Sequence, residues 1–93
     1  MMIKYSDDDL EKIHRRTIVN YSRMMKSKDC GCFYCLEHFL PNEVKYWDDR
    51  NGKTAVCPRC SIDSVIGSNS RVDDDLLAAL NKRYFGFSNM SGD

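Results

Sequence analysis

Two short cysteine pairs constrain this chain more than any other feature of its sequence. Cys32 and Cys35 are separated by two residues, as are Cys57 and Cys60, and residues 36–56 lie between the pairs. A C-x2-C turn places two sulfurs on the same side of a tight loop, and two such turns supply the four ligands of a tetrahedral metal site. The ligands predicted for one structural Zn²⁺ per chain are Cys32, Cys35, Cys57 and Cys60. The alternative is a set of reduced thiols or disulfides.

The size of the chain makes a bound metal useful. Its 93 residues are predicted to form one domain, residues 1–93. A chain of this length buries only about 60–65% of its unfolded surface, so its apolar core is marginal. Structural zinc contributes an apparent binding free energy on the order of 10 kcal/mol or more, much of it as folding energy. We therefore expect loss of the metal to mean loss of the fold.

Two further residues near the first pair are candidate ligands. Cys30 is an alternative to Cys32, but a C-x4-C pair is a looser chelate than C-x2-C, so we expect a free thiol. His38 is an alternative to one of the sulfurs. Because four cysteines are already present, we expect His38 to lie beside the ligands or at the surface.

The cysteine count also bears on the cellular compartment. Five cysteines are an awkward number for a secreted disulfide framework. Residues 1–10 are polar and acidic where a signal peptide would have an apolar run, and no apolar run approaches the length of a membrane span. We therefore expect a soluble protein of the reducing cytoplasm, with no membrane partner.

Residues 6–25 are predicted to form one amphipathic helix. Ser6 can act as N-cap, with Asp9 at the third helical position. At 100° per residue, the apolar side chains fall within an arc of about 140°. The opposite face carries a basic stripe, which consists of Lys12, Arg15, Arg16, Arg23 and Lys26. Such a stripe is either a solvated helix face or a surface for phosphates or an acidic protein.

The cysteine pairs lie in residues 30–67, which are predicted to form a zinc ribbon. Residues 43–48 alternate in polarity, and Asn51-Gly52 suits a tight hairpin turn after them. Residues 61–67 are rich in β-branched side chains and end in glycine, which indicates a strand after the second pair. A treble clef, the alternative fold, would begin a helix at that point.

The last element is predicted to be an amphipathic helix over residues 73–85, capped by Asp73 or Asp74. Gly86 is expected to end this helix, and residues 86–93 to form a frayed tail. The elements together predict a small α+β, zinc-stabilised domain in which two amphipathic helices pack beside zinc-ribbon-like β-hairpins. A helix face of this kind is also a possible homodimer contact.

The second half of the chain carries a longer motif, W-x-D followed by T-A-x-C-P-x-C-x-x-D-S-V-I-G, at residues 47–49 and 54–67. This pattern resembles a family of small uncharacterised bacterial and phage zinc-ribbon-like proteins. The resemblance covers about residues 32–85. It implies a bound zinc ion and a cytoplasmic bacterial or phage setting, and it carries no catalytic residue.

The sequence offers little for catalysis. A catalytic zinc needs an open coordination position, whereas four cysteines close the shell. The acidic residues Asp48, Asp49 and Asp63 are candidates for Mg²⁺, but carboxylates in turns more often cap backbone N–H groups. We therefore expect a non-catalytic recognition module and not an enzyme.

Two classes of partner fit such a module. Equal numbers of basic and acidic residues, 14 of each, and a surface rich in Arg, Tyr and Met favour a protein partner, for which the chain would act as a small regulator or inhibitor. The alternative is a nucleic acid bound by the basic stripe, with Arg59 as a further phosphate contact. Protein comes first because acidic clusters at residues 7–9 and 73–75 repel phosphates unless they face away.

Overall fold

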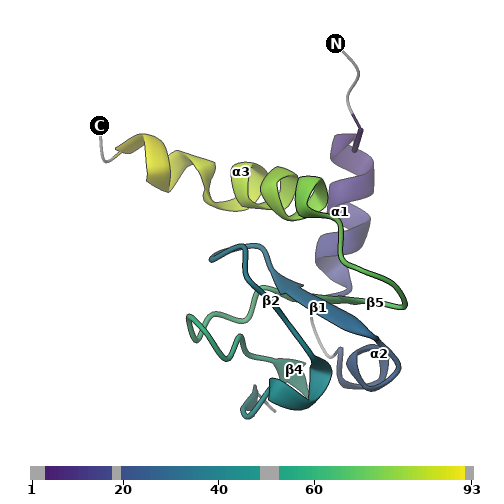
Figure 1. The fold of residues 1–93 in the computed structure, drawn as a ribbon. Coiled ribbons are helices and arrows are strands. Elements are labelled where there is room, and N and C mark those ends of the chain that lie inside the picture. Colours follow the sequence, from purple (N-terminus) through teal and green to yellow (C-terminus); the bar gives the residue numbers. More distant parts are fainter. Residues whose placement is uncertain (1–3, 18–19, 49–52, 92–93) are drawn as a thin grey trace.

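A three-stranded antiparallel sheet forms the middle of the molecule (Figure 1). The computed structural model describes residues 4–17, 20–48 and 53–91, and of residues 87–91 it describes the backbone alone. The strands, in their order across the sheet, are β2 (His38–Phe39), β1 (Asp29–Cys32) and β5 (Val65–Ser68). Short antiparallel strands and three helices make this a small mixed α+β fold.

A second, two-stranded sheet confirms the hairpin predicted between the cysteine pairs. Strand β3 (Trp47–Asp48) pairs antiparallel with β4 (Thr54–Ala55), after a 3-10 turn η1 (Pro41–Glu43). The predicted turn residues, Asn51 and Gly52, lie outside the described residues. Beyond the second cysteine pair the chain continues as strand β5, as residues 61–67 indicated, although the strand itself begins only at Val65.

Alternate residues of the central sheet face two different apolar cores. Cys30, Cys32 and Val65 face the first, which we call the cysteine core; its other buried members are Met24, Phe39, Val44, Ala55 and Cys57. Ile66 and the neighbouring Phe33 face the second, the helix core, whose other buried members are Leu10, Val72, Leu77 and Leu80. Because side chains alternate along a strand, one thin sheet serves both cores.

Helix α3 (Asp74–Ser91) lies across the helix-core face of the sheet (Figure 1). Gly31 of β1 allows the close approach, since a Cβ at this position would lie 2.9 Å from Cδ1 of Leu77 and 3.2 Å from Cγ1 of Val72. The first turn is capped by Asp73, whose carboxylate accepts a hydrogen bond of 3.0 Å from the N–H of Asp75.

Helix α3 is longer than the sequence predicted. It continues through Ser91, so residues 86–91 are helical and not a frayed tail. The backbone of Gly86 is not in the left-handed conformation with which glycine ends helices, and a Cβ there would meet only Lys82, at 3.7 Å. Nothing at Gly86 therefore forces the helix to stop.

The N-terminal segment forms two helices, so the prediction of one helix over residues 6–25 is wrong. Helix α1 (Asp7–Arg15) begins with the expected capping box, in which Ser6 and Asp9 each accept the other's backbone N–H at 3.2 Å. Helix α2 (Tyr21–Met25) is separate and begins after Asn20.

The side chain of Asn20 explains the break between the two helices. It is buried, donates from Nδ2 to the carbonyl of Val65 at 3.0 Å, and accepts at Oδ1 the N–H of Ala55 at 2.9 Å. Buried backbone groups at the ends of short strands need partners, and this amide satisfies one in β4 and one in β5. The link requires Asn20 to enter the core, which an uninterrupted helix would not allow.

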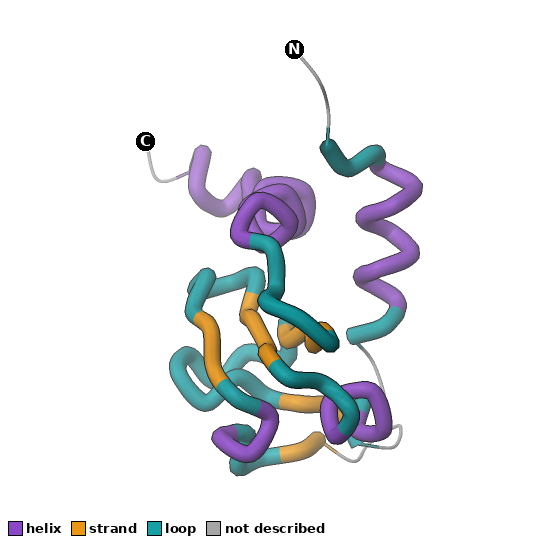
Figure 2. Tube along the Cα trace, turned by 45° about the vertical axis from the view of Figure 1, so that its right-hand side comes forward, coloured by secondary structure: helices purple, strands orange, loops and turns teal. Residues whose placement is uncertain are grey.

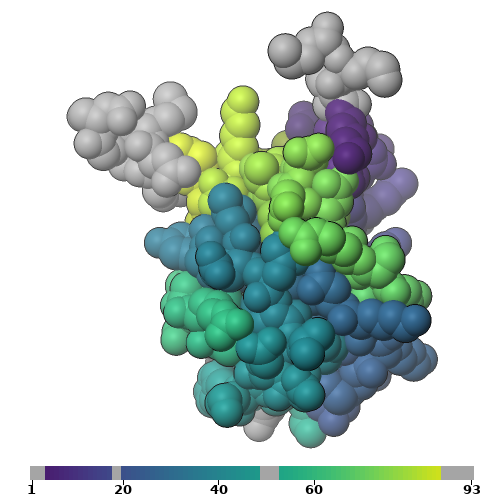
Figure 3. All heavy atoms as spheres, viewed as in Figure 1, coloured from purple at the N-terminus to yellow at the C-terminus, as the bar shows by residue number. Residues whose placement is uncertain are grey.

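Helices α1 and α3 lie together on one side of the strands (Figure 2). The ring of His14 stacks on Tyr84 with 3.9 Å between centroids, and Arg83 forms ion pairs with Asp7 at 3.0 Å and Glu11 at 2.9 Å. In the space-filling view the green segment that leads into α3 lies above the blue α2–β1 region, on the right of the molecule (Figure 3).

Among the described helices, none is both long and apolar enough to cross a bilayer.

Candidate metal centre

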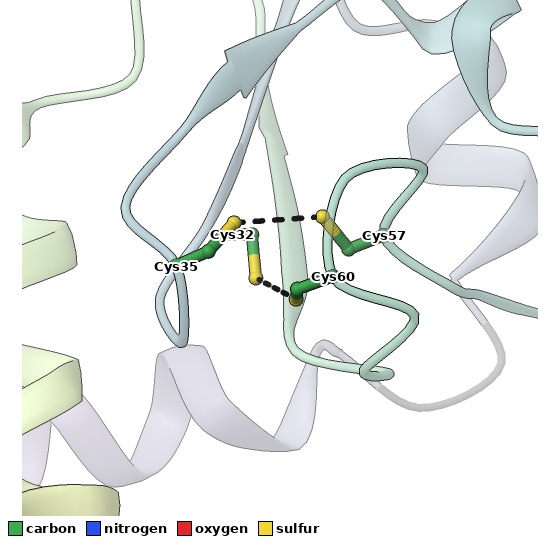
Figure 4. Close-up of side chains that lie close together, drawn as sticks. All are labelled: Cys32, Cys35, Cys57 and Cys60. Atoms are coloured by element: carbon green, nitrogen blue, oxygen red, sulfur yellow. Dashed lines mark hydrogen bonds between the residues drawn. The ribbon is translucent and has the colours of Figure 1, made fainter.

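The four paired cysteines converge on one point, where the loop after β1 faces the loop after β4 (Figure 4). Their sulfurs all lie within 4.8 Å of one another. The Cys32 and Cys60 sulfurs are 3.6 Å apart, and those of Cys35 and Cys57 are 3.7 Å apart. A tetrahedral metal with metal–sulfur bonds of about 2.3 Å requires sulfur–sulfur separations of about 3.8 Å. The four thiols can therefore coordinate a metal ion, and they fit the dimensions of zinc.

The first cysteine pair sits in a tight turn, the first knuckle (residues 32–37). The N–H of Cys32 donates to the carbonyl of Glu37 at 3.0 Å, and the carbonyl of Cys32 accepts the N–H of Leu36 at 2.8 Å. The sulfur of Cys32 also accepts the N–H of Tyr34 at 3.3 Å. These three bonds fix the direction of the first sulfur.

The second cysteine pair repeats this pattern in the second knuckle (residues 57–62). The N–H of Cys57 donates to the carbonyl of Ile62 at 2.9 Å, and its carbonyl accepts the N–H of Ser61 at 3.0 Å. Its sulfur accepts the N–H of Arg59 at 3.3 Å. Two turns with the same hydrogen bonds thus face each other, and each contributes half of the cluster.

Each knuckle includes one residue with left-handed backbone, which follows the second cysteine. Leu36 has φ 66° and Ser61 has φ 67°. This conformation costs a non-glycine residue roughly 1–2 kcal/mol. Other interactions of the knuckle must therefore offset this backbone cost.

Residues outside the cysteine pairs support the cluster, and the sequence analysis missed them. The buried hydroxyl of Ser64 lies 3.2 Å from the sulfur of Cys32. From α3, the amide of Asn81 donates to the carbonyls of Phe33 and Tyr34, at 3.0 and 3.2 Å. The backbone between Cys32 and Cys35 is thereby tied to α3. Ser64 lies within the D-S-V-I-G motif, which was its one sequence signal.

The thiols differ in how readily they ionise. Burial opposes the thiolate of Cys32, but hydrogen bonds from Ser64 and from backbone N–H groups outweigh it and lower the pKa of that thiol. Burial raises the pKa of Cys35 to about 11 and also raises the pKa of Cys60. A divalent cation stabilises all the thiolates that it binds, so a bound metal would lower the pKa of these thiols and favour their ionised form.

The two alternative ligands stand apart from the cluster. Cys30 is fully buried, its sulfur lies 3.9 Å from that of Met24, and burial raises its pKa to about 12. His38 is likewise outside the group of close ligand atoms. None of the five cysteines forms a disulfide. The four-cysteine grouping predicted from spacing is confirmed as a geometric cluster.

His38 instead joins two carboxylates from distant parts of the chain. Its Nδ1 lies 2.9 Å from Asp29 of β1, and its Nε2 lies 2.5 Å from Asp74 of α3. Asp29 also accepts the N–H of Val72 at 2.8 Å. The hydrogen bond to Asp74, together with that to Asp29, raises the pKa of His38. This contact fastens the start of α3 to the sheet.

These pKa shifts predict a pH window for stability. Because the pKa of His38 is higher in the folded protein than its usual value of 6.5, protonated His38 contributes its full stabilisation of the fold below pH 6.5. This stabilisation is lost as the pH rises through the raised pKa of the folded state. Asp29 and Asp74 have pKa values below 3.8, so their contributions are present above 3.8 and lost in stronger acid. The contact therefore contributes most between about pH 4 and pH 6.5.

We expect the free energy of unfolding of the metal-loaded wild type to fall by about 1 kcal/mol more than that of His38→Gln between about pH 6 and pH 9. Urea unfolding at both pH values measures this difference. The variant retains the cysteines, so their own pH dependence cancels in the comparison. Equal pH dependence of the two proteins would show that His38 is not bound to its carboxylates as a cation.

The basic stripe does not lie on one helix, because α1 ends at Arg15 and α2 begins at Tyr21. Lys12 and Arg15 belong to α1 and Arg23 to α2, while Arg16 and Lys26 are the residues that follow these helices. Three of the five stripe residues, Arg16, Arg23 and Lys26, line a common cleft. Arg59 is elsewhere, on the second knuckle, and pairs with Glu43 at 2.9 Å.

The acidic residues considered for Mg²⁺ do not form a metal site in the described part of the chain. There, the four cysteines are the one group of three or more histidines, cysteines or carboxylates with ligand atoms close together. Asp48 and Asp63 do not belong to such a group, and Asp49 lies outside the described residues.

Comparison with protein-family models, curated proteins and solved structures gives no match to this chain. The resemblance to small zinc-ribbon-like proteins therefore stays a prediction.

Proposed function

We propose that this chain is a non-catalytic recognition module whose fold is held by one structural zinc ion. The observation that carries the proposal is the closed set of four cysteine sulfurs within 4.8 Å. Four thiolates fill a tetrahedral shell and leave no position for a substrate or an activated water. Thiolate-rich tetrahedral sites select zinc or iron–sulfur clusters. We favour zinc because four cysteines in two C-x2-C pairs are the typical ligand set of a structural zinc site.

The paired knuckles and the strand after the second knuckle support a zinc-ribbon-like arrangement. Knuckle one joins β1 to β2, and knuckle two joins β4 to β5. Because β1 pairs with β5, the strand before the first knuckle and the strand after the second lie in one sheet. In a treble clef the second cysteine pair would lead directly into a helix, whereas here α3 begins only at Asp74.

A protein partner is the first candidate because the first knuckle exposes apolar side chains. Tyr34 is 48% exposed and Leu36 is 44% exposed, although both sit on a rigid, hydrogen-bonded turn. Aromatic and aliphatic groups on a preorganised surface are typical interface anchors, since ordering them costs little on binding. We infer that this knuckle contacts a protein surface.

Pull-down from a bacterial lysate, with and without nuclease, tests this function. The wild type should capture a protein that resists nuclease, and Leu36→Asn with Tyr34→Ser should reduce capture about tenfold or more. Asparagine tolerates the left-handed backbone at position 36, so the turn is kept. Tyr46→Ser is the matched control, since Tyr46 is 65% exposed and lies outside the knuckles. Capture that nuclease abolishes would favour a nucleic-acid partner instead.

Nucleic-acid binding is the second candidate, and one observation favours it. Within the described residues, Arg16, Arg23 and Lys26 have no carboxylate at ion-pair distance. By contrast, Arg59 and Arg71 each have one and Arg83 has two. Unneutralised cations on one surface attract polyanions.

A further inference from the structure

A cleft of about 530 Å³ is lined by residues at the end of α1, in and after α2, in β5 and around the start of α3. Its walls come from the end of α1, from α2 and from residues 66–73. Clefts of this size accommodate small organic ligands. It is separate from the cysteine cluster, since no cysteine lines it.

The charge of the cleft is strongly positive. Four basic residues line it, against one acidic residue, Asp73. Asp73 is already neutralised, because Lys4 pairs with it at 2.7 Å and the hydroxyl of Tyr5 donates to it. The four cationic side chains are Arg16, Arg23, Lys26 and Arg71. Of these, Arg71 alone has an ion-pair partner among the described residues, the exposed Asp74 at 3.2 Å.

The remaining lining residues divide into polar and apolar groups. The polar ones offer hydroxyl or amide groups beside the cations; they are Asn20, Ser27, Ser68 and Asn69. Asn20 is committed to the strands, but Ser27, Ser68 and Asn69 lie nearer the surface. Ile13 and Leu76 are partly exposed and give the cleft an apolar side. Cations, hydroxyls and an apolar wall together suit a phosphate ester with an organic part.

A second hollow in the molecule provides a contrast. It lies beside η1 and the second knuckle and holds about 940 Å³. Three carboxylates, Glu43, Asp48 and Asp63, line it with only two cations, Lys45 and Arg59. Arg59 is moreover paired with Glu43 at 2.9 Å. The positive character therefore belongs to the first cleft and is not a general property of the surface hollows.

We propose that the cleft between α1, α2 and residues 66–73 binds phosphate groups of a nucleotide or a nucleic-acid strand, through Arg16, Arg23, Lys26 and Arg71. Guanidinium groups bind phosphate through two parallel N–H···O bonds. They can bind carboxylates in the same way, so an acidic peptide serves as the competing probe in the test below. This inference deepens the second candidate function, nucleic-acid binding, and does not rest on a protein partner at the first knuckle. A module of this kind can carry both surfaces.

NMR titration of the zinc-loaded, ¹⁵N-labelled protein tests the proposal with three probes: ATP without magnesium, a single-stranded oligothymidine, and a polyglutamate peptide. We expect ATP or the oligonucleotide to shift the amides of Ser27, Ser68 and Asn69 at physiological salt. Binding should weaken as salt rises, because releasing counterions into a more concentrated salt solution gains less free energy. Shifts with ATP identify a nucleotide site, and shifts with the oligonucleotide alone identify a nucleic-acid strand as the source of phosphate; both support the proposal.

A charge-matched pair of variants makes the test specific. Arg16→Glu with Arg23→Glu should weaken phosphate binding about tenfold or more. Lys12→Glu with Arg15→Glu changes the net charge equally, but these residues do not line the cleft, so the effect should be within about twofold. Retained zinc and an unchanged amide spectrum show that each variant is folded.

Three results would overturn the proposal. The first is the absence of cleft shifts with both phosphate probes at physiological salt. The second is equal weakening by the two double variants, which would indicate attraction to overall charge. The third is binding of polyglutamate to the cleft as tightly as the phosphate probes, which would indicate an acidic protein surface.

Discussion

Replacing Cys57 by serine is expected to unfold the protein. Cys57 lies in the cysteine core, is almost fully buried, and its sulfur lies 3.7 Å from that of Cys35 across the two knuckles. Metal binding worth on the order of 10 kcal/mol is comparable with the whole net stability of a small domain. Circular dichroism and amide dispersion should show an unfolded chain, and metal analysis should show less than one zinc per chain.

The matched control for this variant is Cys30→Ser. Cys30 is a buried cysteine of the same core, but its sulfur lies beside Met24 and outside the cluster. It should keep one zinc and lose only about 1–2 kcal/mol, the cost of a buried hydroxyl. A folded, zinc-loaded Cys57→Ser, or loss of zinc from Cys30→Ser alone, would show that the ligand set is wrong.

The second large effect is expected from Asn20→Ala. The substitution leaves two buried backbone groups, the N–H of Ala55 and the carbonyl of Val65, without their partner. Each unsatisfied group costs roughly 1–3 kcal/mol, so the loss of both should lower the free energy of unfolding by about 2–6 kcal/mol. Urea unfolding of the zinc-loaded protein measures the loss.

Two further variants define what Asn20 contributes. Asn20→Asp keeps an acceptor for Ala55 but removes the donor to Val65 and buries a charge, so it should not restore stability. Asn42→Ala changes an exposed asparagine and should stay within about 0.5 kcal/mol of the wild type. If Asn20→Ala also stays within that range, the amide does not hold β4 and β5 together.

The sequence predicted those features that depend on neighbouring residues. The spacing of Cys32, Cys35, Cys57 and Cys60 brings two pairs of sulfurs together in tight turns, and the structure confirms their cluster. The capping box of Ser6 and Asp9 is likewise local. Trp47, the first residue of the W-x-D motif, packs against the cysteine core.

The errors came from contacts between distant residues. Apolar periodicity over residues 6–25 continued through Asn20, and no local pattern shows that this amide is needed by β4 and β5. The broken helix then redistributed the basic stripe, so that Arg16 and Arg23 share a cleft with Arg71, 48 residues beyond Arg23 in the chain. Ser64 and Asn81 also support the first knuckle through contacts with residues far away in the sequence. Such roles depend on the fold and not on spacing.

Native mass spectrometry of the purified protein tests the central claim most directly. The account predicts one zinc ion per folded chain, held by Cys32, Cys35, Cys57 and Cys60, and a shift to the highly charged, unfolded form when a chelator removes it. A metal-free chain with the narrow charge distribution of a folded protein, unchanged by chelator, would contradict it.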